Sequence, residues 1–232
     1  MFWQVVKRSV CGLGAAGLIS AQAYAGSALV NGGATSVLLD TDTLSSAASL
    51  TLSSVSPDVI SPGAIPGSVA FSVNSRSAAP LPTTFSYDPA DFLGTFSGTI
   101  EHTGSVFFNA DSVEVGNFSI AFDANRAGTL GGNASGFFVE STTGLSAILF
   151  DIENPSLLNA AADALQIGAN LLVSPEFGAF LLNNQLSTSN LAGATVGQAE
   201  VNATAIPTPT AAAGALLGLG LLAARRRETV RA

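Results

Sequence analysis

Few residues of this chain have the chemistry that catalysis requires. His102 is the only histidine in 232 residues, and no G-x-S-x-G nucleophile elbow accompanies it. A zinc site with one histidine would need cysteines or several carboxylates, and the only cysteine, Cys11, lies in an N-terminal leader. We therefore expect His102 to be a structural residue beside Glu101, in a turn before Gly104. The protein is not expected to be an enzyme.

Carboxylates are the other candidates, because closely spaced acids can supply oxygen ligands to Ca²⁺. None of the pairs matches the EF-hand spacing or a glycine-rich calcium repeat. We interpret them mainly as solvated loop acids, and predict no catalytic residue, metal or cofactor. The pairs that keep calcium open as an alternative are Asp40 and Asp42, Asp88 and Asp91, and Asp151 and Glu153.

Sugar chemistry has little support in the residue types. A glycosidase needs two carboxylates at a defined separation, which a sequence cannot show. Sugar-binding surfaces commonly use tryptophan, but the sole tryptophan, Trp3, lies in the leader. A carbohydrate-binding module and a secreted hydrolase are therefore weaker alternatives than a structural protein.

The N-terminus has the order of a secretory signal peptide. Lys7 and Arg8 precede an uncharged, mostly apolar run from 9 to 20, and Ala23 and Ala25 supply the small residues of an A-x-A site. The apolar run of about a dozen residues is too short to span a bilayer. We predict a signal peptide over 1–25 with Gly26 as the mature N-terminus. A retained anchor or a buried helix is the alternative.

The charge of the exported part excludes one class of partner. The whole chain has a net charge of −8, but the segment 26–205 carries fifteen carboxylates against Arg76 and Arg126, a net charge near −13. Such a domain repels phosphate backbones, so nucleic-acid binding is not expected. The mature chain has no cysteine, so it has no disulfide framework.

The segment 26–205 is long enough for one sizeable core and is patterned as β-structure. Phe118, Ile120 and Phe122 alternate with polar or small residues, as in a half-buried strand. We predict a mainly β fold, an antiparallel β-sandwich-like domain with its main core at about 84–202. The candidate strands are 36–39, 49–55, 68–73, 94–101, 105–110, 117–123, 136–140, 147–152, 170–173 and 195–202.

One helix is expected to interrupt the strands. Asn154 is a suitable N-cap and Pro155 a suitable first residue, so we predict a helix over about 155–166. A short helical turn is also indicated after Ser174. The segment 26–82 is poorer in aromatics and is interpreted as a looser sheet or a partly flexible arm. The residues expected to include core positions are Phe96, Phe118, Ile120, Phe122, Phe138, Leu149 and Ile152.

The C-terminus contains three elements in a fixed order. Pro207, Thr208 and Pro209 precede an Ala/Gly/Leu stretch over 211–224, and Arg225-Arg226-Arg227 follows. Fourteen residues make roughly 21 Å of helix, short of the roughly 30 Å of a hydrocarbon core. Uncharged residues continue back to Val201, so we predict a strained or tilted transmembrane helix over about 207–224. The arginines would hold its end in the cytoplasm.

This tail, over 206–232, resembles the PEP-CTERM sorting tails of Gram-negative bacteria, in a proline-threonine-proline variant with Thr208 in place of the usual glutamate. The segments 172–177 and 194–199 also look like a β-rich domain found ahead of such tails. The resemblance implies transient inner-membrane anchoring, processing by an exosortase-like enzyme, and delivery to the cell surface or the exopolysaccharide matrix. We therefore expect a structural or adhesive role in a biofilm or similar matrix. An ordinary single-pass anchor is the alternative for the tail.

Overall fold

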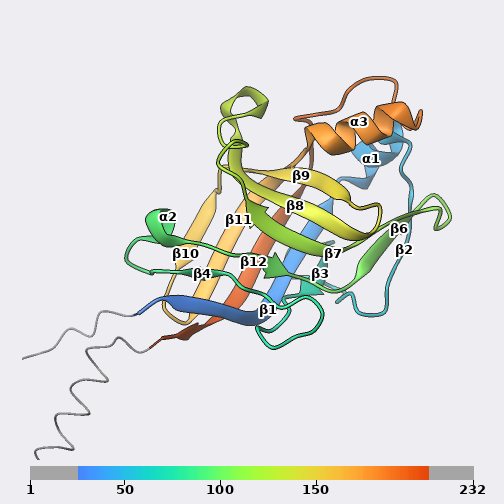
Figure 1. Ribbon diagram of the computed structural model, residues 1–232. Coiled ribbons are helices and arrows are strands. Elements are labelled where there is room, and N and C mark those ends of the chain that lie inside the picture. Colours follow the sequence, from blue (N-terminus) through green and yellow to red (C-terminus); the bar gives the residue numbers. More distant parts are fainter. Residues whose placement is uncertain (1–25, 209–232) are drawn as a thin grey trace, which may run out of the picture.

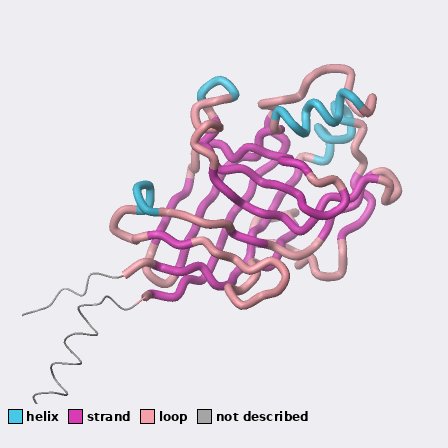
Figure 2. Tube along the Cα trace, in the orientation of Figure 1, coloured by secondary structure: helices cyan, strands magenta, loops and turns pink. Residues whose placement is uncertain are grey.

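The computed structural model describes residues 26–208, which form a single antiparallel β-sheet that curls over on itself (Figure 1). Strands dominate and the helices lie at the periphery (Figure 2). The strands are β1 (Ala28–Leu39), β2 (Leu52–Val55), β3 (Val69–Ser72), β4 (Ser86–Tyr87), β5 (Ile100–Glu101), β6 (Ser105–Phe108), β7 (Val113–Phe122), β8 (Ala134–Gly144), β9 (Ala147–Glu153), β10 (Leu157–Ala160), β11 (Ala164–Val173) and β12 (Thr195–Pro207).

Three α-helices start where a side chain caps the free backbone N–H groups of the first turn. Asp40 caps the first, Asp91 the second, and Ser174 the third, which also has a proline in its first turn. The last of these confirms the helical turn predicted after Ser174. The helices are α1 (Thr41–Ala48), α2 (Phe92–Thr95) and α3 (Pro175–Asn183), and a 3-10 turn covers Leu130–Gly132.

The predicted antiparallel β-fold is confirmed, but the architecture is one continuous sheet and not two separate ones. The strand order is β2-β6-β7-β8-β9-β11-β12-β1-β3, with β4, β5 and β10 pairing on its margins. Figure 1 shows β7, β8 and β9 crossing over β11, β12 and β1. The inner faces of these two halves enclose the core, as the two sheets of a sandwich would.

The two ends of the curled sheet meet along a seam that isolated bridges hold. Val73, just after β3, pairs with His102, just after β5, and Ile60 pairs with Ala70 of β3. The backbone N–H of Asn74 donates to the Glu101 carbonyl at 2.7 Å across the same seam. β4 extends the seam, because it pairs with β1 and its Ser86 pairs with Ser97 in the segment before β5.

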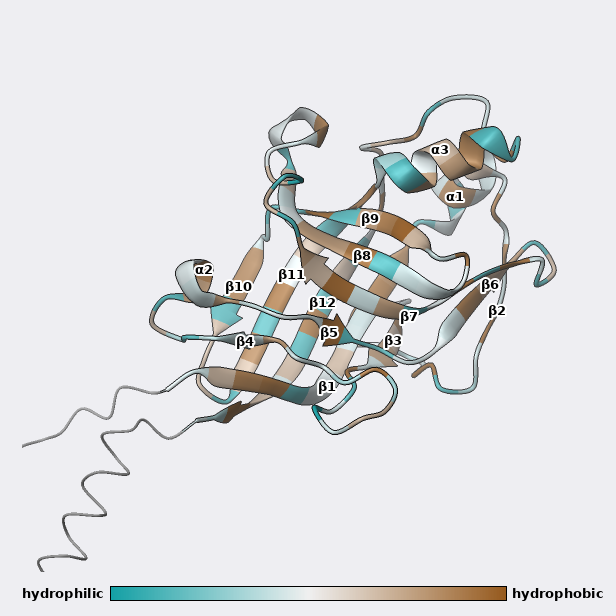
Figure 3. Ribbon diagram, in the orientation of Figure 1, coloured by the Kyte–Doolittle hydropathy of each residue, from teal (hydrophilic) through white to brown (hydrophobic). Residues whose placement is uncertain are grey.

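The long ladders lie between β11, β12 and β1. β12 pairs with β1 from Pro207 to Gly197 and with β11 from Thr204 to Thr195. Hydrophobic and hydrophilic residues alternate along β11 and β12 (Figure 3), because one face of each strand packs on the core and the other meets solvent. The alternation of apolar and polar residues in the sequence therefore reflects strands that have one buried face and one exposed face.

The helix predicted over 155–166 is wrong. Leu157–Ala160 is β10, and Ala164–Val173 is β11, and the two form an antiparallel hairpin. The alanines of this segment favour a helix locally. However, β11 also pairs with β12 and β9, so tertiary pairing outweighs the local preference.

The predicted core residues divide into three groups. Ile120, Leu149 and Ile152 are buried, whereas Phe96 and Phe118 are half-buried and pack against the core. Phe122 is 39% exposed at the end of β7, and Phe138 faces outward, where the Arg126 guanidinium lies 5.5 Å from its ring centroid. Its neighbour Phe137 is buried instead, because a register shift in β8 sets which of the two adjacent phenylalanines points inward.

The segment 26–82 contributes to the core, in contrast to the looser arm that its composition indicated. β1 lies between β12 and β3 in the sheet. Val30, Leu44, Leu50 and Phe71 are all buried. The core therefore extends to the first residues that the structure describes, and does not begin at about 84.

Both ends of the described chain lie on the same side of the molecule, away from α1 and α3 (Figure 1). Thr208 donates its backbone N–H and its hydroxyl to the carbonyl of Ser27, at 3.0 and 2.7 Å. A β-carbon at Gly26 would overlap the carbonyl oxygen of Thr208, so the glycine permits this close approach. Within residues 26–208, no helix is long and apolar enough to cross a bilayer.

Candidate ligand-binding cavity

The core is divided into two clusters of buried hydrophobic residues. No buried residue belongs to both clusters, and only the half-buried Val37 and Phe150 pack against both. A cavity of about 80 Å³ lies along this division, lined by side chains from both clusters. The division marks a place where the two halves of the curled sheet do not fill the space between them.

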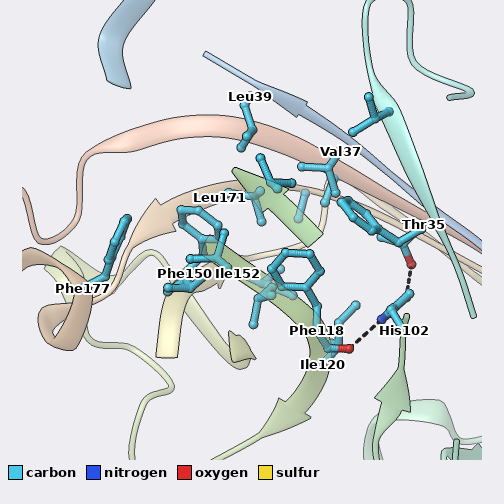
Figure 4. A pocket seen from close by; sticks show the side chains of 18 of the residues that line it. Thr35, Val37, Leu39, His102, Phe118, Ile120, Phe150, Ile152, Leu171 and Phe177 are labelled. Atoms are coloured by element: carbon cyan, nitrogen blue, oxygen red, sulfur yellow. Dashed lines mark hydrogen bonds between the residues drawn. The ribbon is translucent and has the colours of Figure 1, made fainter. Parts of the chain in front are cut away.

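Small side chains on the long ladders leave this space. Ala169 of β11 pairs with Ala199 of β12, and Ala199 pairs with Val37 of β1, so these three residues form a row across the sheet. Phe118 of β7 and Phe150 of β9 line the cavity from the other half (Figure 4). This row, with two alanines and a valine, lies opposite aromatic rings and leaves a cavity within an otherwise close-packed core.

The cavity has a polar group at one end only. His102 and Thr35 lie at one side of the view in Figure 4, and Phe177 of α3 at the other. Thr35 Oγ1 is 2.7 Å from His102 Nε2, and His102 Nδ1 is 3.0 Å from the Phe118 carbonyl oxygen. No charged side chain lines the cavity. We call His102 and Thr35 the His102 pair.

The hydrogen-bond partners of the His102 pair determine which ring nitrogen carries the proton and which group donates. A carbonyl can only accept, so His102 Nδ1–H donates to Phe118 and Nε2 carries a lone pair. The Thr35 hydroxyl therefore donates to Nε2. Burial lowers the pKa of His102 to about 4, while the Phe118 carbonyl opposes that shift. The imidazole is neutral at physiological pH and has no free nitrogen for catalysis.

A second polar cluster, which is partly buried, lies on the outer face of the same sheet. Arg126, from the loop after β7, donates to Asp151 of β9 through Nε at 2.6 Å and Nη2 at 2.8 Å. Arg126 also donates to Glu176 of α3 at 2.7 and 3.0 Å. These bonds, with Glu176 first, raise the pKa of Arg126 and lower that of Glu176. We call these three residues the Arg126 network.

Most of the carboxylates that left calcium open accept hydrogen bonds within the fold. Asp40 caps α1 and accepts from the backbone N–H and hydroxyl of Thr43, which lower its pKa. Asp42 lies in the first turn of α1, where its backbone carbonyl accepts from Ser45 and Ser46. Of this pair, the structure uses Asp40 as a helix cap and places Asp42 in the first turn of the same helix.

The other two pairs have similar roles. Asp91 caps α2, and Asp88 accepts from the N–H of Ala90 in the turn before it. Asp151 is fully buried against Arg126, and Glu153 accepts from the Asn170 amide at 2.7 Å. Within residues 26–208, no group of three or more histidine, cysteine or acidic residues is arranged to hold a metal ion.

The predicted processing residues fall at the margin of the structure. Gly26, Pro207 and Thr208 are described, and Pro207 is the last residue of β12. Ala23, Ala25, Pro209 and Arg225–Arg227 lie outside the described residues, as does the predicted transmembrane segment beyond Thr208. The signal peptide and the sorting tail therefore stay predictions.

Comparison with known protein families and with curated proteins finds no match to this chain. Among solved structures, the chain is similar to the C-terminal domain of HtaA from Corynebacterium glutamicum. The identity is 16%, the match covers 77% of this chain and 99% of that domain, and the TM-score is 0.47.

Sequence reasoning missed the cavity and the partner of His102. Thr35 and His102 are 67 residues apart, and no local pattern links them. A weak signal was present at Ala169, because Ile167 and Leu171, two positions away on the same face of the strand, are larger apolar residues. Only the strand register shows that Ala169 and Ala199 are adjacent.

Proposed function

We propose that this chain is an exported, non-enzymatic surface protein, with a structural or adhesive role at the cell surface or in an extracellular matrix. The observation that carries the proposal is the pairing of Ser27 with Thr208. It puts the predicted signal-peptide junction and the predicted sorting motif together at one end of the domain. A domain with this geometry is suited to display from a membrane by that end, with α1 and α3 on the far side.

In this proposal, the C-terminal tail directs the export of the domain and its delivery to the surface. The domain passes the inner membrane, the tail anchors it transiently, and an exosortase-like enzyme processes the tail near Pro207, Thr208 and Pro209. Exopolysaccharide is the expected environment of the released domain. β12 runs up to Pro207, which has no backbone N–H, so the predicted recognition segment begins at the end of the last strand that the structure describes.

Two further observations support a non-catalytic role. Both ring nitrogens of His102 are engaged with Thr35 and the Phe118 carbonyl. Asp151, a member of one of the three candidate calcium pairs, is bound on both oxygens by Arg126. The structural role therefore has more support than the calcium-binding alternative or the secreted hydrolase.

Fractionation of cells into membrane, surface and medium tests the proposal, with mass spectrometry of the protein's C-terminus. The double variant Pro207→Ala/Pro209→Ala should insert but remain unprocessed, so the uncut chain accumulates in the membrane. Replacing Arg225-Arg226-Arg227 by serine should remove the stop and weaken retention before processing. Thr204→Ala, on the same strand but outside the motif, is the control and should be processed normally. A mature surface protein that still carries Arg225 to Ala232 would show an ordinary anchor.

A further inference from the structure

We propose that the end of the domain at which both chain ends lie rests against the bilayer, with Leu93 of α2 inserted among uncharged phospholipid headgroups. The inference deepens the proposed function, because it rests on anchoring of the chain by its C-terminal tail. It names the surface of the domain that faces the membrane and the class of lipid that this surface fits.

The two most exposed large hydrophobic side chains of the described residues are Leu93 and Ile206. Leu93 is 74% exposed and Ile206 is 50% exposed, whereas the others are at most 44% exposed. Exposure alone does not indicate a partner, since isolated exposed leucines are common on soluble domains. The position of these two side chains on the domain is what indicates one.

Both side chains lie at the end where the chain leaves the domain. Ile206 precedes Pro207 and pairs with Leu29, and Leu29 also pairs with Ser86 of β4. The strands β12, β1 and β4 are therefore neighbours at this end, and α2 follows β4 after a short turn. In Figure 1, α2 and both ends of the described chain lie on the side opposite α1 and α3. We call Leu29, Leu93 and Ile206 the apolar rim.

Contacts on both sides of Leu93 hold it outside the core. The preceding residue, Phe92, is buried, and its ring centroid lies 5.4 Å from that of Tyr87. Asp91 caps α2 by accepting a hydrogen bond from the backbone N–H of Gly94. Turning Leu93 inward would therefore withdraw the Phe92 ring from the core. The leucine is presented to the surroundings by a fixed turn of helix, and not by a loop that could fold back.

The distance between the domain and the predicted membrane span is short. The span is predicted over about 207–224, and β12 ends at Pro207. Thr208 donates to the Ser27 carbonyl through two hydrogen bonds, of 3.0 and 2.7 Å, so the start of the tail is held to the domain. Each further residue of extended chain adds only about 3.5 Å. With the tail inserted, the apolar rim therefore lies at the level of the headgroups.

The charge near the apolar rim selects the headgroup. Asp88 and Asp91 precede α2, and Asp163 lies in the turn between β10 and β11. Burial raises the pKa of Tyr87 to about 12, and the charge of Asp163 contributes to this shift, which places that carboxylate at the same end. In the described part of the chain, Arg76 is the one basic residue outside the Arg126 network. An anionic leaflet would therefore be repelled, whereas uncharged headgroups would not.

Tryptophan fluorescence tests the contact. Trp3, in the predicted leader, is the only tryptophan, so Trp3→Phe gives a background in which an introduced tryptophan is the sole one. The full chain with Leu93→Trp in this background would be reconstituted into phosphatidylcholine nanodiscs, with or without bromine on the acyl chains. We expect a blue-shifted emission and about twofold quenching by bromine, because interfacial side chains lie roughly 5–10 Å into the headgroup and acyl boundary.

The matched control is Leu182→Trp in the same background. Leu182 is a 42% exposed leucine of α3, on the opposite side of the domain. Its emission should neither shift nor be quenched. Nanodiscs in which half of the lipid is phosphatidylglycerol should reduce the quenching of Leu93→Trp at low salt. High salt should restore the quenching, because it screens the repulsion between the carboxylates and the anionic lipid.

The outcomes separate this inference from the anchoring on which it rests. If the chain co-elutes with the nanodiscs but Leu93→Trp is neither shifted nor quenched, the anchoring stands and the contact is refuted. Equal quenching at Leu93→Trp and Leu182→Trp would refute the orientation. Unchanged quenching in phosphatidylglycerol nanodiscs at low salt would refute the preference for uncharged headgroups. A chain that does not co-elute with nanodiscs would contradict both the anchoring and this inference.

Discussion

The Arg126 network and the His102 pair are both polar clusters on a sheet with an apolar core, and they differ in charge and in burial. Arg126 is charged, lies on the outer face, and donates four hydrogen bonds to Asp151 and Glu176. The His102 side chain is neutral, lies in the core, and is hydrogen-bonded to Thr35 and the Phe118 carbonyl. One cluster joins a loop, a strand and a helix through charged groups. The other joins β1, the segment after β5 and β7 through neutral hydrogen bonds.

This difference predicts two kinds of effect on stability. A charged network with a buried member should lose much stability when that member is removed. A buried neutral pair should cost less to break, and should make stability depend on pH through its histidine. The following variants test that distinction, from the largest expected effect to the smallest.

Asp151→Ala should have the largest effect on the free energy of unfolding. Asp151 is fully buried, and its removal leaves the Arg126 guanidinium, whose side chain is only 13% exposed, without its principal buried partner. Breaking a buried pair in this way costs about 3–5 kcal/mol. Denaturant unfolding followed by circular dichroism measures the loss. Asp58→Ala, at an exposed position, is the control, and equal losses in the two variants would contradict the structural role of the network.

Acid should destabilise the protein through His102. Burial lowers the pKa of His102 in the folded protein to about 4, from 6.5 in the unfolded chain. The unfolded chain therefore binds a proton first, so stability is complete above pH 6.5 and falls as the pH drops toward 4, by about 3 kcal/mol in total.

His102→Gln should flatten this dependence between pH 6.5 and 4.5. The pKa of Glu176 is lowered by its bonds to Arg126, so its contribution is lost only at lower pH, below that window. Unfolding free energies measured at half-unit pH steps separate the two groups. Identical slopes in the wild-type protein and His102→Gln would mean that His102 is not buried as the neutral form.

Thr35→Val should destabilise the protein less than either of these changes. The variant preserves the shape of the side chain but leaves Nε2 of His102 buried without a donor. An unsatisfied buried acceptor costs about 1–3 kcal/mol. Thr35→Ser retains the hydroxyl and should recover most of the loss. If valine and serine destabilise equally, the methyl contact, and not the hydrogen bond, is what Thr35 contributes.

Glu176→Gln should have the smallest effect. The Glu176 side chain is 45% exposed, so solvent screens its attraction to Arg126. We expect a loss below about 1 kcal/mol that shrinks further at high salt. Urea unfolding at low and high ionic strength measures it. A loss as large as that of Asp151→Ala would show that the network depends on its exposed member.

The sequence predicted those parts of the fold that local patterns encode. The alternation through Phe118 and Ile120 indicated β7, and Ser174 followed by Pro175 indicated the start of α3. Both signals depend only on neighbours in the chain. The antiparallel, mainly β character could be predicted for the same reason.

The predictions that were wrong or missing concern features that depend on how strands distant in the sequence pair with one another. The alanine-rich segment after Pro155 favours a helix alone but forms strands because β9 and β12 are available on either side of β11. The sequence did not show which of the adjacent Phe137 and Phe138 points into the core. The register shift in β8 determines this orientation. The cavity could not be predicted at all, since it depends on Ala169 and Ala199 becoming neighbours.

The central claim, that His102 is held as a neutral imidazole in the core whereas the Arg126 network is charged, is tested most directly by a pH titration of the His102 ring resonances in the folded protein, labelled with isotopic histidine. His102 is the only histidine in the chain, so its resonances need no further assignment. The account predicts that the ring stays neutral as the pH falls toward about 4. A titration midpoint near 6.5, the ordinary value for histidine, would contradict it.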